Sequence, residues 1–309
     1  MKKFDLLVPG EVNPDLILTD PNLEHRFGQT EILVEDIALT VGSSSAIFAC
    51  GAARLGLRVA FIGVVGEDLF GRFMLEVMRS RQVDVSNVIV DKNKATGLSV
   101  ILNRIDDRAI LTHLGAINAL RGEQITDELL AQTRHLHVAS YFLQTNLQPG
   151  LPDLFQRAQA LGLTTSLDTN WDPVEKWIGV DKLLKLTTVF LPNENEARSL
   201  TETPTVEEAV ENLASKASVI AVKLGSDGGL AFDGVSLYRA SIVPVEVIDT
   251  VGAGDSFNAG FLYGFLKGWP LERSLKFGVI CGSLSTRMAG GINSQPELDE
   301  ALNVLDLRS

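Results

Sequence analysis

Cysteine is nearly absent from this sequence: only Cys50 and Cys281 occur, each among small and apolar neighbours. Two such residues do not form a disulfide framework, and they favour a reduced, cytoplasmic setting. The sequence also lacks any uncharged apolar run of about 18 residues, and its first apolar run is interrupted at Asp5 and ends at Pro9. These absences argue against a membrane span and against a secretory signal peptide.

Positive charge is scarce as well, since 27 Lys and Arg residues stand against 39 Asp and Glu residues, for a net charge of -12. A nucleic-acid partner needs a basic surface, so this balance argues against one. Small anions remain compatible with it, because a few backbone amides and a metal ion can hold them. The four histidines, His25, His113, His135 and His137, show no metal-ligand clustering, and we interpret them as structural.

No internal repeat, low-complexity tract or flexible linker divides the chain, which predicts a single domain over 1–309. Apolar runs without alternation predict buried strands at 4–10, 59–66, 135–140, 163–170, 188–193 and 219–225. Amphipathic patterns predict helices between them, at 44–56, 70–81, 151–162 and 205–217. Strands that alternate with helices predict an α/β fold whose mainly parallel central sheet carries helices on both faces. In such a sheet, ligands bind at the carboxyl ends of the strands.

Two segments break this pattern, because apolar and polar residues alternate along 30–41 and 96–116. The second segment is expected to fold back at Asp106–Asp107 as an antiparallel hairpin. Alternation predicts a sheet with one face on water or on a partner. We therefore predict a small accessory β-sheet, built from inserted segments at about 12–40 and 95–115, that forms a lid, a surface through which two copies of the chain make a homodimer, or both.

The stretch "IDTVGAGDSFNAGF" at 248–261 concentrates the chemistry of the sequence. A strand is expected over 243–248, and a helix is expected over 256–267 that stops at Gly268. Between them, 252–254 is a Gly-Ala-Gly bend, whose small residues leave backbone N–H groups uncovered at the start of a helix. That arrangement suits a phosphate or a developing negative charge.

Asp255, in the first turn of that helix, has two readings from the residues alone. Aspartate is a common helix cap, but that reading leaves the glycine-rich bend unexplained. A dinucleotide-binding fingerprint is not favoured, because Phe257 takes its third glycine position and the stretch lies late in the chain. Taken alone, Asp255 is therefore interpreted as a helix cap, and the Gly-Ala-Gly bend before it stays without a structural explanation.

At every defined position, "DTVGAGDSFNAGFL" (249–262) resembles the carboxyl-terminal signature of the PfkB-type, ribokinase-like carbohydrate kinases. Other landmarks of that family are resembled in order by "GEVNPD" (10–15), 41–71, "TGLSVIL" (96–102), "PNENE" (192–196) and "VKLGSDGG" (222–229). The resemblance implies a ribokinase-like fold with a small β lid, and an enzyme that uses ATP and Mg2+ to phosphorylate a sugar. Phosphoryl transfer needs mainly positioning and electrostatic stabilisation, and the family residues would provide both.

The resemblance implies that Asp255 is the catalytic base, which accepts the proton of the attacking sugar hydroxyl. The amides of Gly252, Ala253 and Gly254 would form an anion hole for the charge on the transferred group. A helix N-terminus lowers the pKa of a carboxyl group, so Asp255 is expected to be ionised and weakly basic.

For the sugar, the resemblance implies binding by Asn13, Asp15, Gly42, Ser43, Ser44, Ser45, Asn170 and Asp255. From the residues alone, Asn13 and Asp15 also fit an Asn-Pro turn with a solvated aspartate, and 42–45 also fits a helix-capping segment. The chain departs from the family at Val41 and Ala46, where a glycine and an asparagine are usual. The identity of the sugar therefore stays open.

For the nucleotide, the resemblance implies binding by Asn193, Lys223, Gly225, Ser226, Gly228 and Gly254. Glu196 would organise Mg2+ through water beside Asn193, although the same N-x-x-E spacing also fits a helix capping box. Asp249 and the Val251 carbonyl are implied as a site for a monovalent cation such as K+.

Together these residues predict an ATP-dependent sugar kinase that transfers the γ-phosphate to a primary hydroxyl of a monosaccharide. A neutral ribose-like or fructose-like sugar is the first expectation, because Asn13 and Asp15 keep the ribokinase-like spacing. Alternatives are a nucleoside kinase or a 2-keto-3-deoxy-sugar-acid kinase of the same fold, and a non-catalytic sugar or nucleotide sensor. The intact Gly-Ala-Gly-Asp unit argues against the sensor, which would not need a base at that place.

Overall fold

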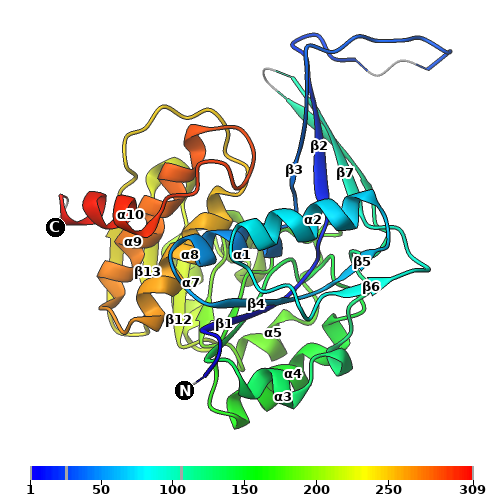
Figure 1. The fold of residues 1–309 in the computed structure, drawn as a ribbon. Coiled ribbons are helices and arrows are strands. Elements are labelled where there is room, and N and C mark those ends of the chain that lie inside the picture. The colour runs from blue at the N-terminus through cyan, green and yellow to red at the C-terminus, as the bar shows by residue number, and fades with distance from the viewer. Residues whose placement is uncertain (1, 25–26, 105–106, 308–309) are drawn as a thin grey trace.

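The computed structural model describes residues 2–24, 27–104 and 107–307, and within them the central sheet has eight strands (Figure 1). In spatial order these are β14 (Leu237–Ala240), β13 (Gly229–Phe232), β12 (Val219–Lys223), β11 (Val189–Phe190), β10 (Thr164–Leu167), β9 (His135–Val138), β1 (Leu6–Pro9) and β4 (Val59–Ile62). Neighbours from β12 to β4 pair in parallel, and β13 and β14 join antiparallel at one edge. The expected mainly parallel sheet is confirmed.

Helices cover both faces of this sheet, as the sequence predicts. The α-helices are α1 (Ser44–Arg54), α2 (Leu69–Ser80), α3 (Asp127–Ala131), α4 (Leu151–Ala160), α5 (Val180–Leu184), α6 (Glu194–Thr201), α7 (Val206–Ala214), α8 (Ala253–Leu266), α9 (Leu271–Leu284) and α10 (Leu298–Asp306). Short 3-10 helices are η1 (Gly122–Gln124), η2 (Gln148–Gly150), η3 (Gly225–Asp227) and η4 (Ser285–Arg287). Side chains alternate along β1, so Leu6 and Val8 join the core under α1, α2 and α8 to α10, whereas Leu7 joins the core under α3 to α7. None of the described helices is long and apolar enough to cross a membrane.

Helix α8 packs closely against α9, and its glycines allow that contact. A Cβ atom at Gly260 would lie 2.7 Å from the Cys281 Sγ, and one at Gly264 would lie 2.7 Å from the Ser274 Oγ. Glycines four residues apart therefore seat α8 on its neighbouring helix. Cys50 and Cys281 are both buried free thiols.

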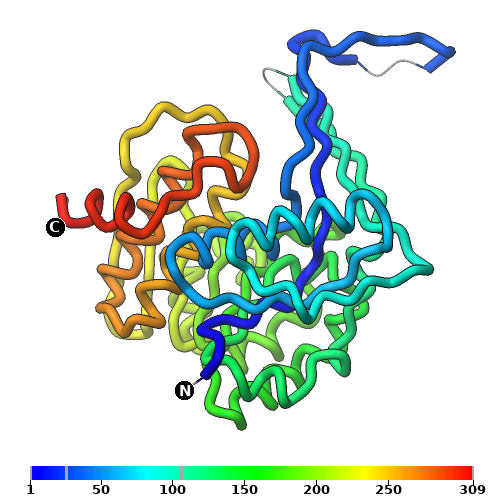
Figure 2. Tube along the Cα trace, in the orientation of Figure 1, coloured from blue at the N-terminus to red at the C-terminus, as the bar shows by residue number. Residues whose placement is uncertain are grey.

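A four-stranded lid stands off one end of the central sheet (Figures 1 and 2). Its strands, in the order β3-β2-β7-β8, are β3 (Asp36–Val41), β2 (Pro14–Thr19), β7 (Leu98–Asn103) and β8 (Arg108–His113). Figure 2 shows the chain entering the lid twice, first in its dark blue part and again in its cyan part. The hairpin expected around Asp106–Asp107 has antiparallel strands, with Asn103 opposite Arg108, and its turn lies partly outside the described residues.

The strand expected over 59–66 divides at Gly63. Its first part is β4, and its second part, β5 (Val64–Gly66), pairs with β6 (Ile89–Asp91) in a separate two-stranded sheet. A Cβ atom at Gly63 would lie 2.6 Å from the Gly10 carbonyl oxygen, so the chain leaves the central sheet where a glycine is needed for close approach.

Two further segments differ from the expected strands. Only Asp36–Val41 of the segment 30–41 pairs, because β2 ends at Thr19, opposite Asp36, and offers no partner to 30–35. Residues 243–248, all of which the structure describes, form no strand. Pro244 cannot donate a ladder hydrogen bond, and the segment runs instead along the cavity described below.

Candidate active site

A cavity of about 840 Å3 lies between the lid and the carboxyl ends of β10, β11 and β12, the edge where parallel α/β sheets bind ligands. Of the residues predicted for the site, the cavity is lined by Asp15, Ser43, Ser44, Asn170, Asn193, Glu196, Lys223, Gly225, Ser226, Gly228, Val251, Gly252, Ala253, Gly254 and Asp255. The lining does not include four other predicted residues, Asn13, Gly42, Ser45 and Asp249. The fold therefore brings most of the predicted residues to one place, from segments that are far apart in the sequence.

Asp15 lies on β2, at the base of the lid, and lines the cavity beside Arg108. Burial raises the pKa of Asp15 to about 6, although a hydrogen bond from Ser99 and the charge of Arg108 act in the opposite direction. A Cβ atom at Gly42 would lie 2.1 Å from the Asp15 Oδ1, so Gly42 leaves room for the carboxylate. The buried Asn13 donates its side-chain amide to the next carbonyl along the chain, at 3.3 Å.

Glu11, which the sequence analysis missed, is a buried carboxylate behind the serines at the start of α1. Its side-chain oxygens accept hydrogen bonds from Ser45 Oγ at 2.5 Å, Ser45 N at 3.2 Å and Ser140 Oγ at 2.7 Å. Ser43 Oγ donates to the Glu11 carbonyl at 2.6 Å. Ser45 thus fixes the cavity wall from behind. The only sequence signal was a carboxylate directly after the first buried strand.

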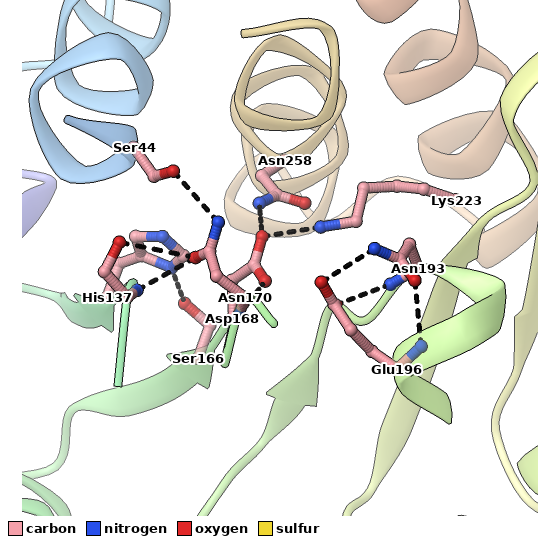
Figure 3. A network of polar contacts seen from close by, with 10 residues as sticks. Ser44, His137, Ser166, Asp168, Asn170, Asn193, Glu196, Lys223 and Asn258 are labelled. Carbon is pink, nitrogen blue, oxygen red and sulfur yellow. Dashed lines mark hydrogen bonds and ion pairs between the residues drawn. The ribbon is translucent and has the colours of Figure 1, made fainter. Parts of the chain in front are cut away.

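Asn170 joins this wall to β10. Its Nδ2 donates to Ser44 Oγ at 3.0 Å, a contact that Figure 3 shows, and its Oδ1 accepts from Ser140 N at 3.0 Å. Ser43, Ser140 and Asn170 have φ values of 70°, 51° and 53°, in the left-handed region that residues other than glycine seldom adopt. Such conformations concentrate at ligand sites, where surrounding contacts hold them in place.

Helix α8 begins at the Gly-Ala-Gly bend, and the structure confirms a turn there. Gly252 has a φ of 73°, and a Cβ atom at this position would lie 2.8 Å from the Gly291 carbonyl oxygen. The Ala253 N–H donates to the Thr250 carbonyl at 3.2 Å and closes the turn. Helix geometry leaves the N–H groups of Gly254 and Asp255 without intrahelical partners, whereas the Ser256 N–H donates to the Gly252 carbonyl at 2.9 Å.

Asp255 stands in this first turn with 7% of its surface exposed. Burial raises the pKa of its carboxyl group well above the ordinary value, and the charge of Asp168 raises it further. The charge of Lys223 and a hydrogen bond from Ser44 partly oppose this rise. The expected lowering of the Asp255 pKa is therefore wrong in direction, because desolvation outweighs the effect of the helix N-terminus. A carboxylate with a raised pKa is the stronger base.

A buried network next to Asp255 joins β10, β12 and α8 (Figure 3). Asp168 follows β10 directly, and its Oδ2 accepts hydrogen bonds from Lys223 Nζ at 2.5 Å and from Asn258 Nδ2 at 2.5 Å. Asn258 was not predicted, although its position three residues after Asp255 places both residues on one face of a helix.

Asn193 and Glu196 form the capping box of α6. The Glu196 carboxylate accepts from Asn193 N at 2.9 Å and from Asn193 Nδ2 at 2.7 Å, and Asn193 Oδ1 accepts from Glu196 N at 2.9 Å. Burial raises the pKa of Glu196, and the charge of Asp168 adds to the rise. Both residues also line the cavity, so capping does not exclude a second role.

The same pair fits a hydrated magnesium ion. A carboxylate offers about four acceptor positions, of which Asn193 occupies two on Glu196. Mg2+ prefers oxygen ligands and keeps several waters, so one carboxylate is sufficient. Within the described ranges, no group of three or more His, Cys, Asp and Glu side chains is placed to hold a metal ion.

Asp249 ties two loops together at the start of α8. Its Oδ1 accepts from Val251 N at 2.9 Å, and its Oδ2 accepts from Gly290 N at 2.8 Å.

At another part of the cavity, Gly225 and Gly228 adopt φ values of 58° and 90° in the loop after β12. These conformations favour glycine and allow a tight turn in the loop that follows β12.

His135 and His137 are buried core residues on β9 that share the Ser166 hydroxyl, each at 2.7 Å. Burial lowers the pKa of both rings to about 3, so both are neutral at pH 7. His113 lies exposed on β8, and His25 lies outside the described residues. Neither buried histidine lines the cavity.

Comparison with known proteins gives a consistent result. The model of a family described as pfkB family carbohydrate kinase matches residues 3–298. A 5-dehydro-2-deoxygluconokinase of Geobacillus thermodenitrificans is 27% identical to the chain and aligns with 97% of it and 92% of its own length. A structure of Arabidopsis thaliana ribokinase complexed with ribose and ATP is 25% identical, with a TM-score of 0.85 and 98% of each chain covered. A putative ribokinase II from E. coli in complex with ATP and Mg2+ has the same fold, with 22% identity, a TM-score of 0.87, and 99% of this chain and 100% of its own covered.

Proposed function

Because the chain belongs to the pfkB family of carbohydrate kinases, we propose that it transfers the γ-phosphate of ATP to a primary hydroxyl group of a monosaccharide. The position of Asp255 carries this proposal. It is a nearly buried carboxylate at the N-terminus of α8, in the same cavity as Asp15 and Asn170. A base at this point can reach both a sugar held by the lid side and a phosphate held by the helix.

In the proposed reaction, Asp255 accepts the proton of the attacking hydroxyl. The raised pKa of this buried carboxyl group makes it a better base than an exposed aspartate. The amides of Gly252, Ala253 and Gly254 form the proposed anion hole, which stabilises charge on the phosphoryl oxygens during transfer. Ala253 already donates to Thr250, so Gly252 and Gly254 would supply most of these contacts.

The nucleotide would lie at the end of the cavity that is lined by Asn193, Lys223, Gly225, Ser226, Gly228 and Gly254. The Arabidopsis thaliana ribokinase and the E. coli relative, both solved with ATP, support ATP as the donor. Asn193 and Glu196 would hold Mg2+ through water. When bound, this ion would neutralise part of the triphosphate charge.

For the acceptor, we propose a neutral ribose-like or fructose-like sugar, held by Asp15, Asn170 and the serines at the start of α1, Ser43 and Ser44. Asn13, Gly42 and Ser45 would support this wall. The ribose complex of the Arabidopsis thaliana relative supports this choice. A sugar acid is the second candidate, because Arg108 of the lid lines the cavity.

A coupled assay of ADP release tests the function over a panel of pentoses, hexoses, sugar acids and nucleosides. We expect turnover with at least one sugar, and a loss of 100-fold or more in kcat for Asp255→Asn, in line with the roughly 10²- to 10⁴-fold contribution of a general base. Asp153→Asn is the matched control, because Asp153 stands in the first turn of α4, outside the cavity lining. Sugar binding without turnover would favour the sensor, and an equally active Asp255→Asn would contradict the mechanism.

We also propose that the lid mediates a homodimer. Apolar side chains of its outer strands, Ile37 on β3 and Leu111 on β8, are exposed in the single chain. Burying them against a second copy would remove apolar surface from water. Mass measurement by light scattering tests this, and a monomer at high protein concentration would contradict it.

Asp249 and the Val251 carbonyl remain the proposed monovalent-cation site. The Asp249 carboxylate carries acceptor positions beyond the two backbone N–H groups that it binds. Activity should then rise when K+ replaces a larger organic cation at constant ionic strength. Equal activity in both salts would contradict the proposal.

A further inference from the structure

Lys223 holds an unusual position for a lysine, because it is nearly buried at the end of β12. Its side chain is 13% exposed, and its Nζ bonds to the Asp168 carboxylate, whose side chain is 2% exposed. Asn258 binds the same Asp168 oxygen, so the acceptor of the lysine is itself fixed from α8. Figure 3 shows these three side chains converging from separate elements.

The lysine runs beneath the anion-hole turn. A Cβ atom at Gly254 would lie 3.3 Å from the Lys223 Cδ and 3.8 Å from its Nζ. Because Gly254 has no side chain, the aliphatic part of the Lys223 side chain can pass close to the first backbone amides of α8. This places the ammonium group on the wall of the cavity, which Lys223 lines together with Gly254 and Asp255.

Lys223 also supplies positive charge, which is scarce among the residues that line the cavity. Three carboxylates, those of Asp168, Glu196 and Asp255, act on its ammonium group. Burial alone would lower the pKa of Lys223, but these three charges together raise it, so the side chain is cationic at pH 7. Along the described cavity lining, the only other cationic side chain is Arg108, which belongs to the lid.

An ammonium group has three N–H donors. In the described part of the chain, Asp168 is the only hydrogen-bond partner seen for the Lys223 Nζ. A nearly buried cation with donors left over, at the edge of an anion hole, is suited to bind an oxyanion.

We propose that Lys223 is a catalytic residue that donates a hydrogen bond to an oxygen of the transferred phosphoryl group, held in place by Asp168 and Asn258. This proposal rests on the proposed kinase function. Lys223 keeps its proton throughout and forms no covalent bond: the sugar oxygen attacks phosphorus, the bond to ADP breaks, and Asp255 takes the hydroxyl proton. The fixed positive charge offsets the three neighbouring carboxylates, which otherwise repel the triphosphate.

The competing explanation is that Lys223 only neutralises the buried Asp168. A double-mutant cycle separates the two, using Lys223→Met, Asp168→Asn and the double variant. Lys223→Met leaves a buried carboxylate unpaired, so it is expected to lose both stability and activity. The double variant removes both charges and should regain stability against urea. Its kcat should stay about 100-fold or more below that of the wild type, as for loss of one oxyanion donor.

Lys216→Met is the matched control, since Lys216 pairs with Asp181 at 2.8 Å outside the cavity lining and should leave kcat unchanged. KM for the sugar should change little in the Lys223 variants, because the sugar contacts lie on the lid side. A Lys223→Met enzyme with wild-type kcat, or a double variant that recovers it, would overturn the role of Lys223 while leaving the kinase function intact. A wild-type protein without turnover on any sugar would overturn both.

Discussion

Replacing Asp15 by asparagine is expected to stabilise the folded protein while it weakens the sugar site. The pKa of Asp15 is raised from 3.8 to about 6, chiefly by burial, so the folded state disfavours the ionised carboxylate. The difference of about 2.2, multiplied by about 1.36 kcal/mol for each pKa unit, corresponds to about 3 kcal/mol. This is the free energy that the ionised group costs the fold at neutral pH.

The sign follows from proton uptake. Because the folded-state pKa is the higher one, folding binds a proton between the two pKa values, and stability falls as pH rises from about 4 to about 6. An asparagine has no such dependence. The free energy of unfolding of Asp15→Asn should therefore exceed that of the wild type by about 1.5 kcal/mol at pH 5 and by about 3 kcal/mol at pH 7.5.

Urea unfolding at several pH values between 5 and 7.5 measures this difference. Glu35→Gln is the matched control, since it removes one negative charge from an exposed position in the lid segment. An Asp15→Asn variant that gains no stability at pH 7.5, or whose gain does not change with pH, would refute the reasoning from burial. In the same preparations, kcat/KM for the sugar should fall, because asparagine offers only one side-chain acceptor oxygen.

Two further substitutions test the α6 capping box and the α8 bend. Glu196→Gln should raise the Mg2+ concentration needed for half-maximal activity by about 10-fold or more, as measured by Mg2+ titration. Thr205→Ala, which removes the cap of α7, is the control: it should cost about 1 kcal/mol of stability and leave the Mg2+ requirement unchanged. An equal rise in the Mg2+ requirement of the Glu196→Gln and Thr205→Ala variants would contradict a metal role for Glu196. Gly252→Ala should lower the free energy of unfolding by more than Gly56→Ala, because both glycines have a left-handed φ but nothing lies within 4 Å of a Cβ at Gly56. Equal losses would show that the contact behind Gly252 has no energetic effect.

The sequence predicted the layered fold from local patterns, and the family resemblance supplied the candidate site residues, most of which line the cavity. Apolar runs specify buried strands, and each predicted site residue near a strand end comes to the same edge of a parallel sheet. The segment 243–248 was wrongly predicted as a strand, because its apolar residues line a cavity instead of pairing.

Polar contacts between residues far apart in the sequence could not be predicted from local patterns. Glu11 meets Ser45 across 34 residues, and Lys223 meets Asp168 across 55, and no periodicity records either pairing. The direction of the Asp255 pKa was also wrong, because the sequence shows the helix start but not the depth of burial. Burial is a property of the assembled fold.

The close contact between α8 and α9 limits which amino acids the glycine positions along it can accept. Gly260, Gly264 and Gly278 each have a backbone or side-chain atom of the partner helix within 3.1 Å of where a Cβ would stand. Any substitution at these positions would push away the helix that carries Asp255. In a library of random substitutions, these three sites should therefore accept few residues other than glycine, whereas exposed positions of the lid tip such as Leu33 should accept almost any side chain.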